Sequence, residues 1–217
     1  MKRLLIATTN PSKLREIRRI LGDSNVDLLS LRDFPPVAEP EETGATFEEN
    51  ARLKALYYDS AVTSTAAAVQ CGPLYTVAED SGLEIEALNG QPGVHSARFL
   101  RSDATYPERF EEIYRRLEQR PSEPRSARFI GAVAVVYASA VIYEARGVVE
   151  GEIAPAARGN NGFGYDPIFF YPPLGCTLGQ ASDEQKERVG HRGQAFRRLA
   201  NWLGTQNGEQ KACPPFR

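Results

Sequence analysis

The sequence predicts an α/β protein, in which strands alternate with helices along the chain. Near its start, the apolar run Arg3–Ala7 has the character of a buried strand and leads directly into an amphipathic helical pattern. In the middle, apolar residues on both sides of Glu79-Asp80-Ser81-Gly82 predict two more strands. Later, the β-branched runs Arg128–Tyr137 and Val141–Val149 are joined by a short turn, which favours an antiparallel hairpin. Such alternation is typical of sheets covered by helices.

Composition and charge exclude several classes of protein. With 217 residues, 41% hydrophobic and 25% charged, the chain can bury a sizeable core as one domain or two lobes. No apolar run has the length of a membrane span. The net charge of −2 without a basic block argues against a polymeric nucleic-acid partner. Three widely spaced cysteines form neither a disulfide framework nor a metal motif, so a reducing cytoplasm is the expected setting.

The stretch after the first strand has the features of an anion site. Thr8-Thr9-Asn10-Pro11-Ser12-Lys13 leads into a helix, with Asn10 as its N-cap and Pro11 at its first position. Free backbone N–H groups and the helix dipole favour phosphate at such a terminus, and Lys13 lies in its first turn. An ordinary capped helix with a surface lysine explains the same residues. It is not a Walker loop, since the glycines and their spacing are absent.

A second helix follows a proline-rich connection over Leu28–Pro40. Thr46-Phe47-Glu48-Glu49 is a capping box that predicts a helix through about Ser60, extended into a loop over Ala61–Pro73. On this helix Asn50 and Lys54 are four residues apart and share a face. That polar pair could reach into a cleft or lie at a solvated edge.

The acidic stretch in the middle of the chain is the first candidate for chemistry. Leu74–Ala78 is predicted as one strand and the alternating Leu83–Ala87 as the next, with Gly82 allowing a turn between them. Two adjacent carboxylates, Glu79 and Asp80, would then stand where a strand ends. They suit binding of Mg²⁺ or deprotonation of a water molecule. An acidic turn that faces solvent is the alternative.

A glycine-rich and aromatic stretch, Arg158–Phe170, is the second candidate. Its glycines allow close approach of the backbone to a ligand. Phe163 or Tyr165 could stack on a planar base, and Asp166 could accept a hydrogen bond from it. A loop that packs on the core is the alternative.

The last part of the chain is predicted as two helices and a tail, after an earlier helix over Thr105–Arg120. A capping box at Ser182 opens a short helix that carries Lys186 and breaks at Gly190; the final helix begins at His191. Arginine greatly outnumbers lysine in this chain, so the lysines retained in such stretches favour specific contacts with phosphate. The residues after 204 are expected to be a disordered tail.

Taken together, these stretches resemble the noncanonical purine nucleoside triphosphate pyrophosphatase family, also called the inosine triphosphate pyrophosphatase family. The resemblance extends from Leu4 to about Leu203 and depends on six motifs in order. They are Ala7–Lys13, Glu41–Ala51, Ala78–Leu83, Pro92-Gly93 with Ser96-Ala97-Arg98, Gly162–Phe169, and His191–Ala195.

The resemblance implies both a fold and an activity. The fold would be a long central mixed β-sheet flanked by helices, with two lobes around an active-site cleft, in a single domain over residues 1–204. The activity would be Mg²⁺-dependent hydrolysis of ITP, dITP and XTP to the monophosphate and pyrophosphate, which clears the nucleotide pool. The resemblance also implies a homodimer.

Roles carried over from the family fall on residues that match its motifs. Asp80 would accept the proton of the attacking water, and it would hold the metal together with Glu41. The triphosphate would be held by Thr8, Thr9, Asn10, Pro11, Ser12 and Lys13. Lys54, Ser81 and Lys186 would contact the phosphate side or order the pocket. The base would be bound by Phe163, Gly164, Tyr165 and Asp166, with His191 and Arg192 donating to its 6-oxo group.

Two departures from the family pattern affect these expectations. Glu79 stands where the family often has aspartate, and Gly190 stands where it often has serine. Two other functions stay open. One is a Maf-like pyrophosphatase that acts on pyrimidine or modified nucleoside triphosphates; the other is a non-catalytic nucleotide-binding protein.

Overall fold

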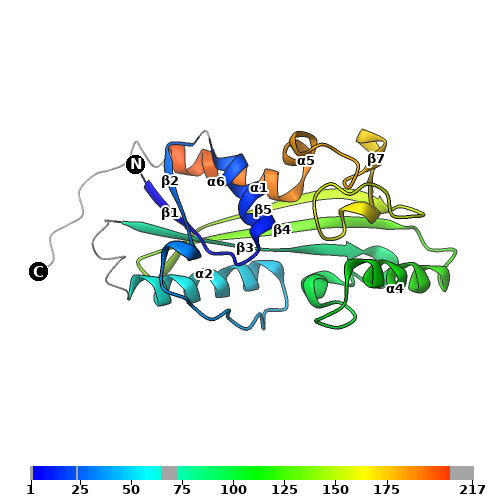
Figure 1. Ribbon diagram of the computed structural model, residues 1–217, viewed down its shortest axis with the longest axis horizontal. Helices are drawn as coiled ribbons and strands as arrows, with labels where there is room; N and C mark the ends of the chain where they lie inside the picture. Colours follow the sequence, from blue (N-terminus) through cyan, green and yellow to red (C-terminus); the bar gives the residue numbers. More distant parts are fainter. Residues whose placement is uncertain (1, 23, 65–72, 206–217) are drawn as a thin grey trace, which may run out of the picture.

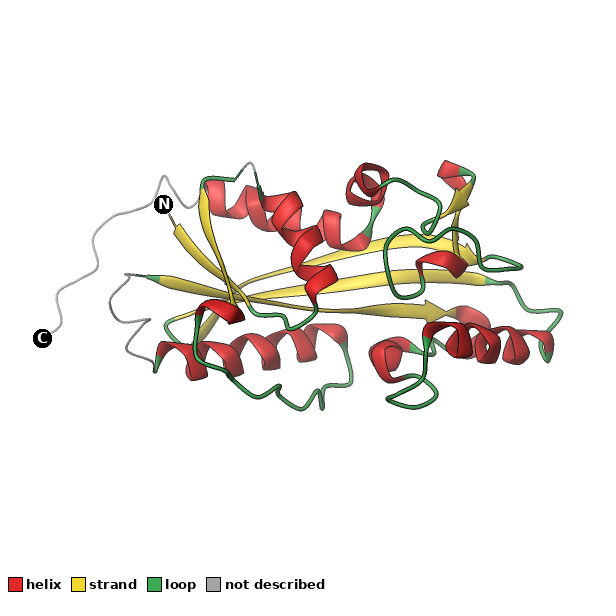
Figure 2. Ribbon diagram, viewed as in Figure 1, coloured by secondary structure: helices red, strands yellow, loops and turns green. Residues whose placement is uncertain are grey.

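The chain forms a mixed β-sheet with helices on both faces (Figures 1 and 2). The computed structural model describes residues 2–22, 24–64 and 73–205. In these residues the sheet has seven strands in the order β2-β1-β3-β4-β5-β6-β7. β1 pairs in parallel with β2 and β3, and the remaining neighbours are antiparallel. The strands are β1 (Lys2–Ile6), β2 (Val26–Ser30), β3 (Leu74–Ile85), β4 (Ser126–Tyr137), β5 (Ala140–Ile153), β6 (Phe169–Tyr171) and β7 (Cys176–Thr177). The predicted α/β fold with a long mixed sheet is confirmed, whereas the two lobes stay a prediction.

The helices divide between the two faces of the sheet. In Figure 1, α2 lies below the sheet, α1 and α6 lie above it, and α4 lies at the far end of the long strands. Their bounds are α1 (Pro11–Leu21), α2 (Phe47–Thr63), α4 (Tyr106–Glu118), α5 (Asp183–Val189) and α6 (His191–Thr205). No helix in the described ranges combines the length and the apolar character that crossing a membrane requires.

The two-residue period of a strand assigns each side chain of β1 to one of these faces. Leu4 and Ile6 belong to the core cluster under α1 and α6. Leu5 belongs to the cluster under α2. Because both faces are covered, the buried part of β1, Leu4–Ile6, is apolar, as a buried parallel strand requires. The predicted strand over Arg3–Ala7 is therefore confirmed, one residue earlier in the chain.

Two predictions about strands are wrong. The predicted connection over Leu28–Pro40 begins too early, since Val26–Ser30 is an edge strand paired in parallel with β1. More importantly, the acidic stretch is not a turn, because β3 continues from Leu74 to Ile85. The distant strand β4 pairs with β3 in one register from Thr76 to Ile85, and this pairing keeps the acidic stretch extended.

Gly82 does not form the predicted turn; it allows the segment around Ser96 to approach β3 closely. An added Cβ at Gly82 would lie 2.4 Å from Oγ of Ser96, whose hydroxyl accepts from the N–H of Leu83 at 2.9 Å. The missing side chain therefore lets the 3-10 helix Gly93–Arg98 pack directly on β3.

The predicted helix starts agree closely with the structure. Capping boxes open α2 at Thr46 and α5 at Ser182, and β4 and β5 form the predicted antiparallel hairpin. α2 ends at Thr63, later than predicted. Most of the predicted loop before Pro73, and the tail after Thr205, lie outside the described residues, while Thr205 itself is the last residue of α6.

Candidate active site

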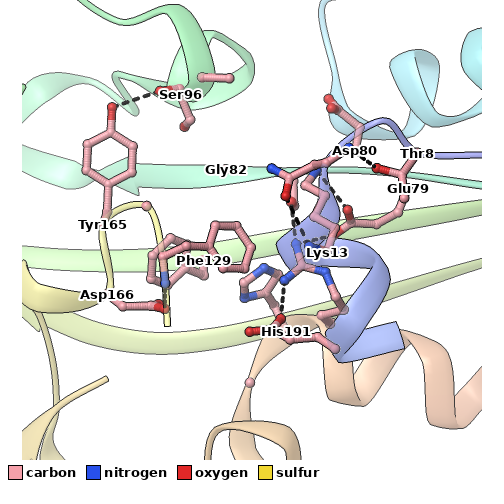
Figure 3. A pocket seen from close by; sticks show the side chains of 18 of the residues that line it. Thr8, Lys13, Glu79, Asp80, Gly82, Ser96, Phe129, Tyr165, Asp166 and His191 are labelled. Carbon is pink, nitrogen blue, oxygen red and sulfur yellow. Dashed lines mark hydrogen bonds and ion pairs between the residues drawn. The ribbon is translucent and has the colours of Figure 1, made fainter. Parts of the chain in front are cut away.

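A pocket opens at the edge of β3, at the point where its neighbour β1 stops. β1 pairs with β3 only as far as Val77, because the chain then leaves the sheet and enters α1. Among the described residues, no named strand continues β1 along this edge. Glu79, Asp80, Ser81 and Gly82 of β3 line the pocket that results (Figure 3).

The start of α1 forms one wall of the pocket, but its backbone donors are already used. Asn10 caps the helix, and its Oδ1 accepts from the N–H groups of Ser12 at 2.9 Å and Lys13 at 3.1 Å. Pro11 has no N–H group. The free N–H groups that were predicted to bind phosphate are therefore occupied. The groups left for an anion are the hydroxyls of Thr8 and Thr9 and the ammonium of Lys13, which line the pocket.

Adjacent positions on a strand place Glu79 and Asp80 on opposite faces of the sheet. Glu79 points toward α1 and α6, where Oε2 lies 2.8 Å from Nζ of Lys13 and Oε1 lies 2.9 Å from Nη2 of Arg192. Burial disfavours the ionised carboxylate, yet Arg192 and Lys13 outweigh it and hold the pKa of Glu79 below its usual range. Glu79 is therefore a buried anion that fixes two cations.

Asp80 points toward α2 and has a different electrostatic setting. Its Oδ1 lies 2.7 Å from Nζ of Lys54, and its Oδ2 accepts from Nδ2 of Asn50 at 3.3 Å. Burial raises the pKa of Asp80, and Lys54 only partly offsets it. A neighbouring pair of carboxylates whose pKa values are displaced in opposite directions has the character of an acid–base site. Lys54 thus lines the pocket, while Asn50 is buried behind Asp80, so neither residue lies at a solvated edge.

A second carboxylate, Glu42, faces Asp80 across Lys54. Nζ of Lys54 lies 3.0 Å from Oε1 of Glu42, and Arg98 donates to Oε2 of Glu42 at 2.9 Å. Glu41, which was predicted to bind the metal, is exposed and is not among the residues that line the pocket. The structure thus places Glu42, and not Glu41, opposite Asp80.

The glycine and aromatic loop forms the other end of the pocket. Tyr165 is buried, and its hydroxyl donates to the carbonyl of Ser96 at 2.8 Å, pointing away from Asp80 (Figure 3). Its ring packs edge-on against Tyr106, which leaves Tyr165 as a packing residue at the pocket wall. Phe163 is only half-buried, with the guanidinium of Arg192 5.4 Å from its ring centroid. Of the two candidate stacking residues, Phe163 has the accessible ring.

Asp166 is engaged within its own loop. It accepts from the N–H of Phe163 at 3.0 Å and forms an ion pair with Nζ of Lys186 at 2.7 Å. Burial raises the pKa of Asp166, against the effect of Lys186. The pair therefore orders the loop beside the position where a base would lie.

The start of α6 brings His191 and Arg192 to the same end. The ring of His191 stacks on Phe129 with centroids 5.0 Å apart, and burial together with Arg192 lowers the pKa of His191 to about 3. His191 is therefore a neutral hydrogen-bonding group at pH 7. Arg192 is buried and donates to Glu79 at 2.9 Å and to Oγ of Ser81 at 3.1 Å. It also donates to Glu16 at 2.5 Å.

Most of the predicted residues come together in this pocket. The pocket-lining set contains Thr8, Thr9, Asn10, Lys13, Lys54, Asp80, Ser81, Phe163, Gly164, Tyr165, Asp166, Lys186, His191 and Arg192. It does not contain Pro11, Ser12 or Glu41.

Sequence reasoning gave no site role to several residues that the structure brings to the pocket: Glu16, Glu42, Ser96 and Phe129. For Glu16 a signal was present, since it lies three residues after Lys13 on one face of a helix. For Phe129 there was none, because it looked like any apolar residue of a strand.

Comparison with known proteins identifies the family of this chain. A protein-family model described as the Ham1 family matches residues 4–202. A protein of Geobacter sulfurreducens named dITP/XTP pyrophosphatase is 42% identical over 96% of this chain and 100% of its own length. Another of that name from Exiguobacterium sibiricum is 38% identical over 95% of this chain and 100% of its own length.

Two solved structures are similar to the whole fold. A HAM1 protein of Coxiella burnetii has a TM-score of 0.81 and 39% identity, covering 94% of this chain and 100% of its own. The Ham1 protein of Staphylococcus aureus has a TM-score of 0.78 and 35% identity, with the same coverage.

Proposed function

Because the chain belongs to the Ham1 family, we propose that it is a nucleoside triphosphate pyrophosphatase that hydrolyses ITP, dITP and XTP to the monophosphate and pyrophosphate. The names of its relatives support the reaction. The observation that carries the proposal is the pair Glu79 and Asp80, which have pKa values displaced in opposite directions within a pocket that three lysines line. A pocket that combines carboxylates with cations suits an anionic substrate and an activated water.

In the proposed reaction Asp80 accepts a proton from water as the water oxygen bonds to the α-phosphorus. The phosphoanhydride bond between the α- and β-phosphates breaks, and pyrophosphate leaves. Lys13 and Lys54 line the pocket, where they pair with Glu79 and Asp80. In the proposed reaction they would neutralise charge on the triphosphate. Positioning and charge neutralisation account for most of the catalysis of phosphoryl transfer, so no covalent intermediate is needed.

The residues present fit a magnesium ion. Glu42 and Asp80 are already bridged by one cationic group, Nζ of Lys54, which lies 3.0 and 2.7 Å from their oxygens. Mg²⁺ takes one or two carboxylates and completes its shell with water and substrate phosphates. Mg²⁺ would supply charge stabilisation at the phosphates.

The base end supports selection of a purine that carries a 6-oxo group. Neutral His191 and the guanidinium of Arg192 are donors at this end, and the ring of Phe163 offers a stacking surface. A keto oxygen accepts from such donors, whereas an amino group would leave buried donors unpaired. That mismatch discriminates by factors of up to about 10⁴.

The proposal extends to the setting in which the enzyme works. Mg²⁺ dependence, a homodimer and a cytoplasmic location belong to it as expectations from the family resemblance. Gel filtration with light scattering tests the homodimer, and a molar mass near that of one chain would contradict it.

The decisive test is pyrophosphate release from dITP, XTP, dATP, dGTP and dTTP, with Mg²⁺ and with EDTA. We expect strong release from dITP and XTP with Mg²⁺ and little from the other nucleotides. Release that favours dTTP would instead support a Maf-like enzyme. Tight binding of nucleotides without release would support a non-catalytic protein.

A further inference from the structure

Asn50 is a buried amide on α2 whose donor and acceptor atoms are both used. It is 0% exposed although it lies beside the pocket. Its Oδ1 accepts from the backbone N–H of Gly44 at 2.8 Å, and its Nδ2 donates to Oδ2 of Asp80 at 3.3 Å. The N–H of Gly44 can only donate, so the amide oxygen must face it and the NH₂ group must face Asp80. The backbone of Gly44 thereby fixes the orientation of Asn50.

Gly44 is needed for this contact because it lets the acidic turn of residues 41–44 approach α2. An added Cβ at Gly44 would lie 2.7 Å from Oδ1 of Asn50 and 2.7 Å from Cβ of Glu49. Two links therefore join the turn to Asp80. One is charged and passes through Lys54 and Glu42; the other is neutral and passes through Asn50 and Gly44.

An arriving substrate would disturb the charged link through Lys54 and leave the neutral link through Asn50 intact. Lys54 is the cation between the carboxylates of Glu42 and Asp80. The phosphates of a substrate would compete with these carboxylates for Lys54, and Mg²⁺ would compete with Lys54 for the carboxylates. Asn50 carries no charge and has no exposed surface. Its hydrogen bond to Asp80 is thus the link that an arriving anion or cation leaves intact.

We propose that Asn50 is a positioning residue that holds Oδ2 of Asp80, so that Oδ1 keeps its direction toward water and metal when Lys54 is drawn to the phosphates. This inference builds on the proposed function, in which Asp80 is the proton acceptor. The chemistry remains with Asp80, and Asn50 acts only through it.

The chain offers a matched control at another point between α2 and β3. Oγ1 of Thr76 donates to Oδ1 of Asp59 at 2.9 Å, and both residues are buried. Neither residue lines the pocket. Thr76→Val removes a buried hydrogen bond between the same two elements, so it reports what a purely structural loss does to turnover.

The experiment compares Asn50→Leu, Asn50→Asp and Thr76→Val in steady-state turnover of dITP. Asn50→Leu removes both contacts and keeps the number and branching of the side-chain heavy atoms. Asn50→Asp keeps an acceptor for the N–H of Gly44, but it replaces the donor to Asp80 with a second carboxyl group. We expect both Asn50 variants to lower kcat by about tenfold or more with KM changed by less than about threefold, as for a misplaced reacting group. Thr76→Val is expected to keep kcat within about twofold of wild type.

A titration with Mn²⁺ alone, followed by water-proton relaxation, gives a readout that does not depend on turnover. We expect Asn50→Leu to weaken Mn²⁺ binding several-fold and Thr76→Val to leave it unchanged. The inference is overturned if both Asn50 variants keep the kcat and the Mn²⁺ affinity of wild type, or if Thr76→Val reproduces their losses. A wild-type protein that releases no pyrophosphate would overturn the proposed function, and the Mn²⁺ titration would still decide the role of Asn50.

Discussion

At the scale of single residues, the neighbouring acids of β3 have separate roles. Asp80 faces α2 and has a raised pKa, whereas Glu79 faces α1 and α6 and stays ionised between two cations. The family often has aspartate in place of Glu79, and the structure shows that the longer side chain reaches both Lys13 and Arg192. Glu79 therefore makes a specific pair of contacts in this chain.

Asp80→Asn is expected to abolish turnover while the fold stays intact. The substitution keeps the volume of the side chain but removes the proton acceptor and a carboxylate ligand for Mg²⁺. Pyrophosphate release from dITP, with circular dichroism as the check on folding, measures the effect. Activity that survives in a well-folded Asp80→Asn protein would remove Asp80 from the reaction.

Arg192→Ala is expected to reduce activity on dITP more than activity on dATP, because only dITP offers an oxygen to the lost donor. The ratio of kcat/KM for the two nucleotides measures this directly. A decrease in that ratio of at least about tenfold is expected for loss of one charged hydrogen bond. If the ratio is unchanged, Arg192 serves only the ion pairs with Glu16 and Glu79.

At the scale of secondary-structure elements, two glycines determine where α6 lies on the sheet. Gly131 of β4 and Gly147 of β5 are cross-strand partners. An added Cβ at Gly147 would lie 2.0 Å from the carbonyl oxygen of His191, and one at Gly131 would lie 2.9 Å from Cδ2 of the same residue. The absence of both side chains makes room for the start of α6.

Gly147→Ala is expected to displace α6, and so to cost about 1–3 kcal/mol of stability and to reduce the preference for dITP. Gly204→Ala is the matched control on α6, because an added Cβ there has no atom within 4 Å. Urea unfolding and the dITP to dATP ratio measure the two effects. A Gly147→Ala protein with wild-type stability and selectivity would show that α6 adapts at no cost.

At the scale of the whole molecule, the stability of the fold depends on the buried charge of Glu79. Its pKa is depressed in the folded state, so its contribution is present above the unfolded pKa of about 4.3 and is lost as pH falls below it. Glu79→Gln leaves Lys13 and Arg192 near a neutral amide, which is expected to cost about 3 kcal/mol at pH 7.

Urea unfolding at pH 7 and at about pH 3 tests this prediction, because most of the contribution of Glu79 is lost below pH 4. Wild type is expected to lose more stability between the two values than Glu79→Gln does. Equal losses would show that Glu79 does not carry the acid dependence of the fold.

Local patterns predicted much of this molecule. The cap at Asn10, the capping boxes at Thr46 and Ser182, and the hairpin of β4 and β5 depend on residues that are close in sequence. Those signals are local, so they can be read without the fold.

The errors arose where distant segments decide the structure. Gly82 looked like a turn residue, but pairing with β4 kept β3 extended. Only a single continuous strand places Glu79 and Asp80 on opposite faces, so this separation could not be predicted from two strands and a turn. Likewise, the position of Glu42 opposite Asp80 depends on the path of the acidic turn around Lys54.

The continuity of β3 also fixes the position of Asp80 relative to the rest of the sheet. A strand advances about 3.3 Å per residue and bends little, so β3 holds Asp80, the proposed proton acceptor, at a fixed position along the sheet. A nucleotide in which extra atoms lie between base and triphosphate would present the wrong bond to Asp80, however well each end bound. Under the proposed function, the fixed position of Asp80 on β3 would therefore select substrates by the distance between their base and their triphosphate.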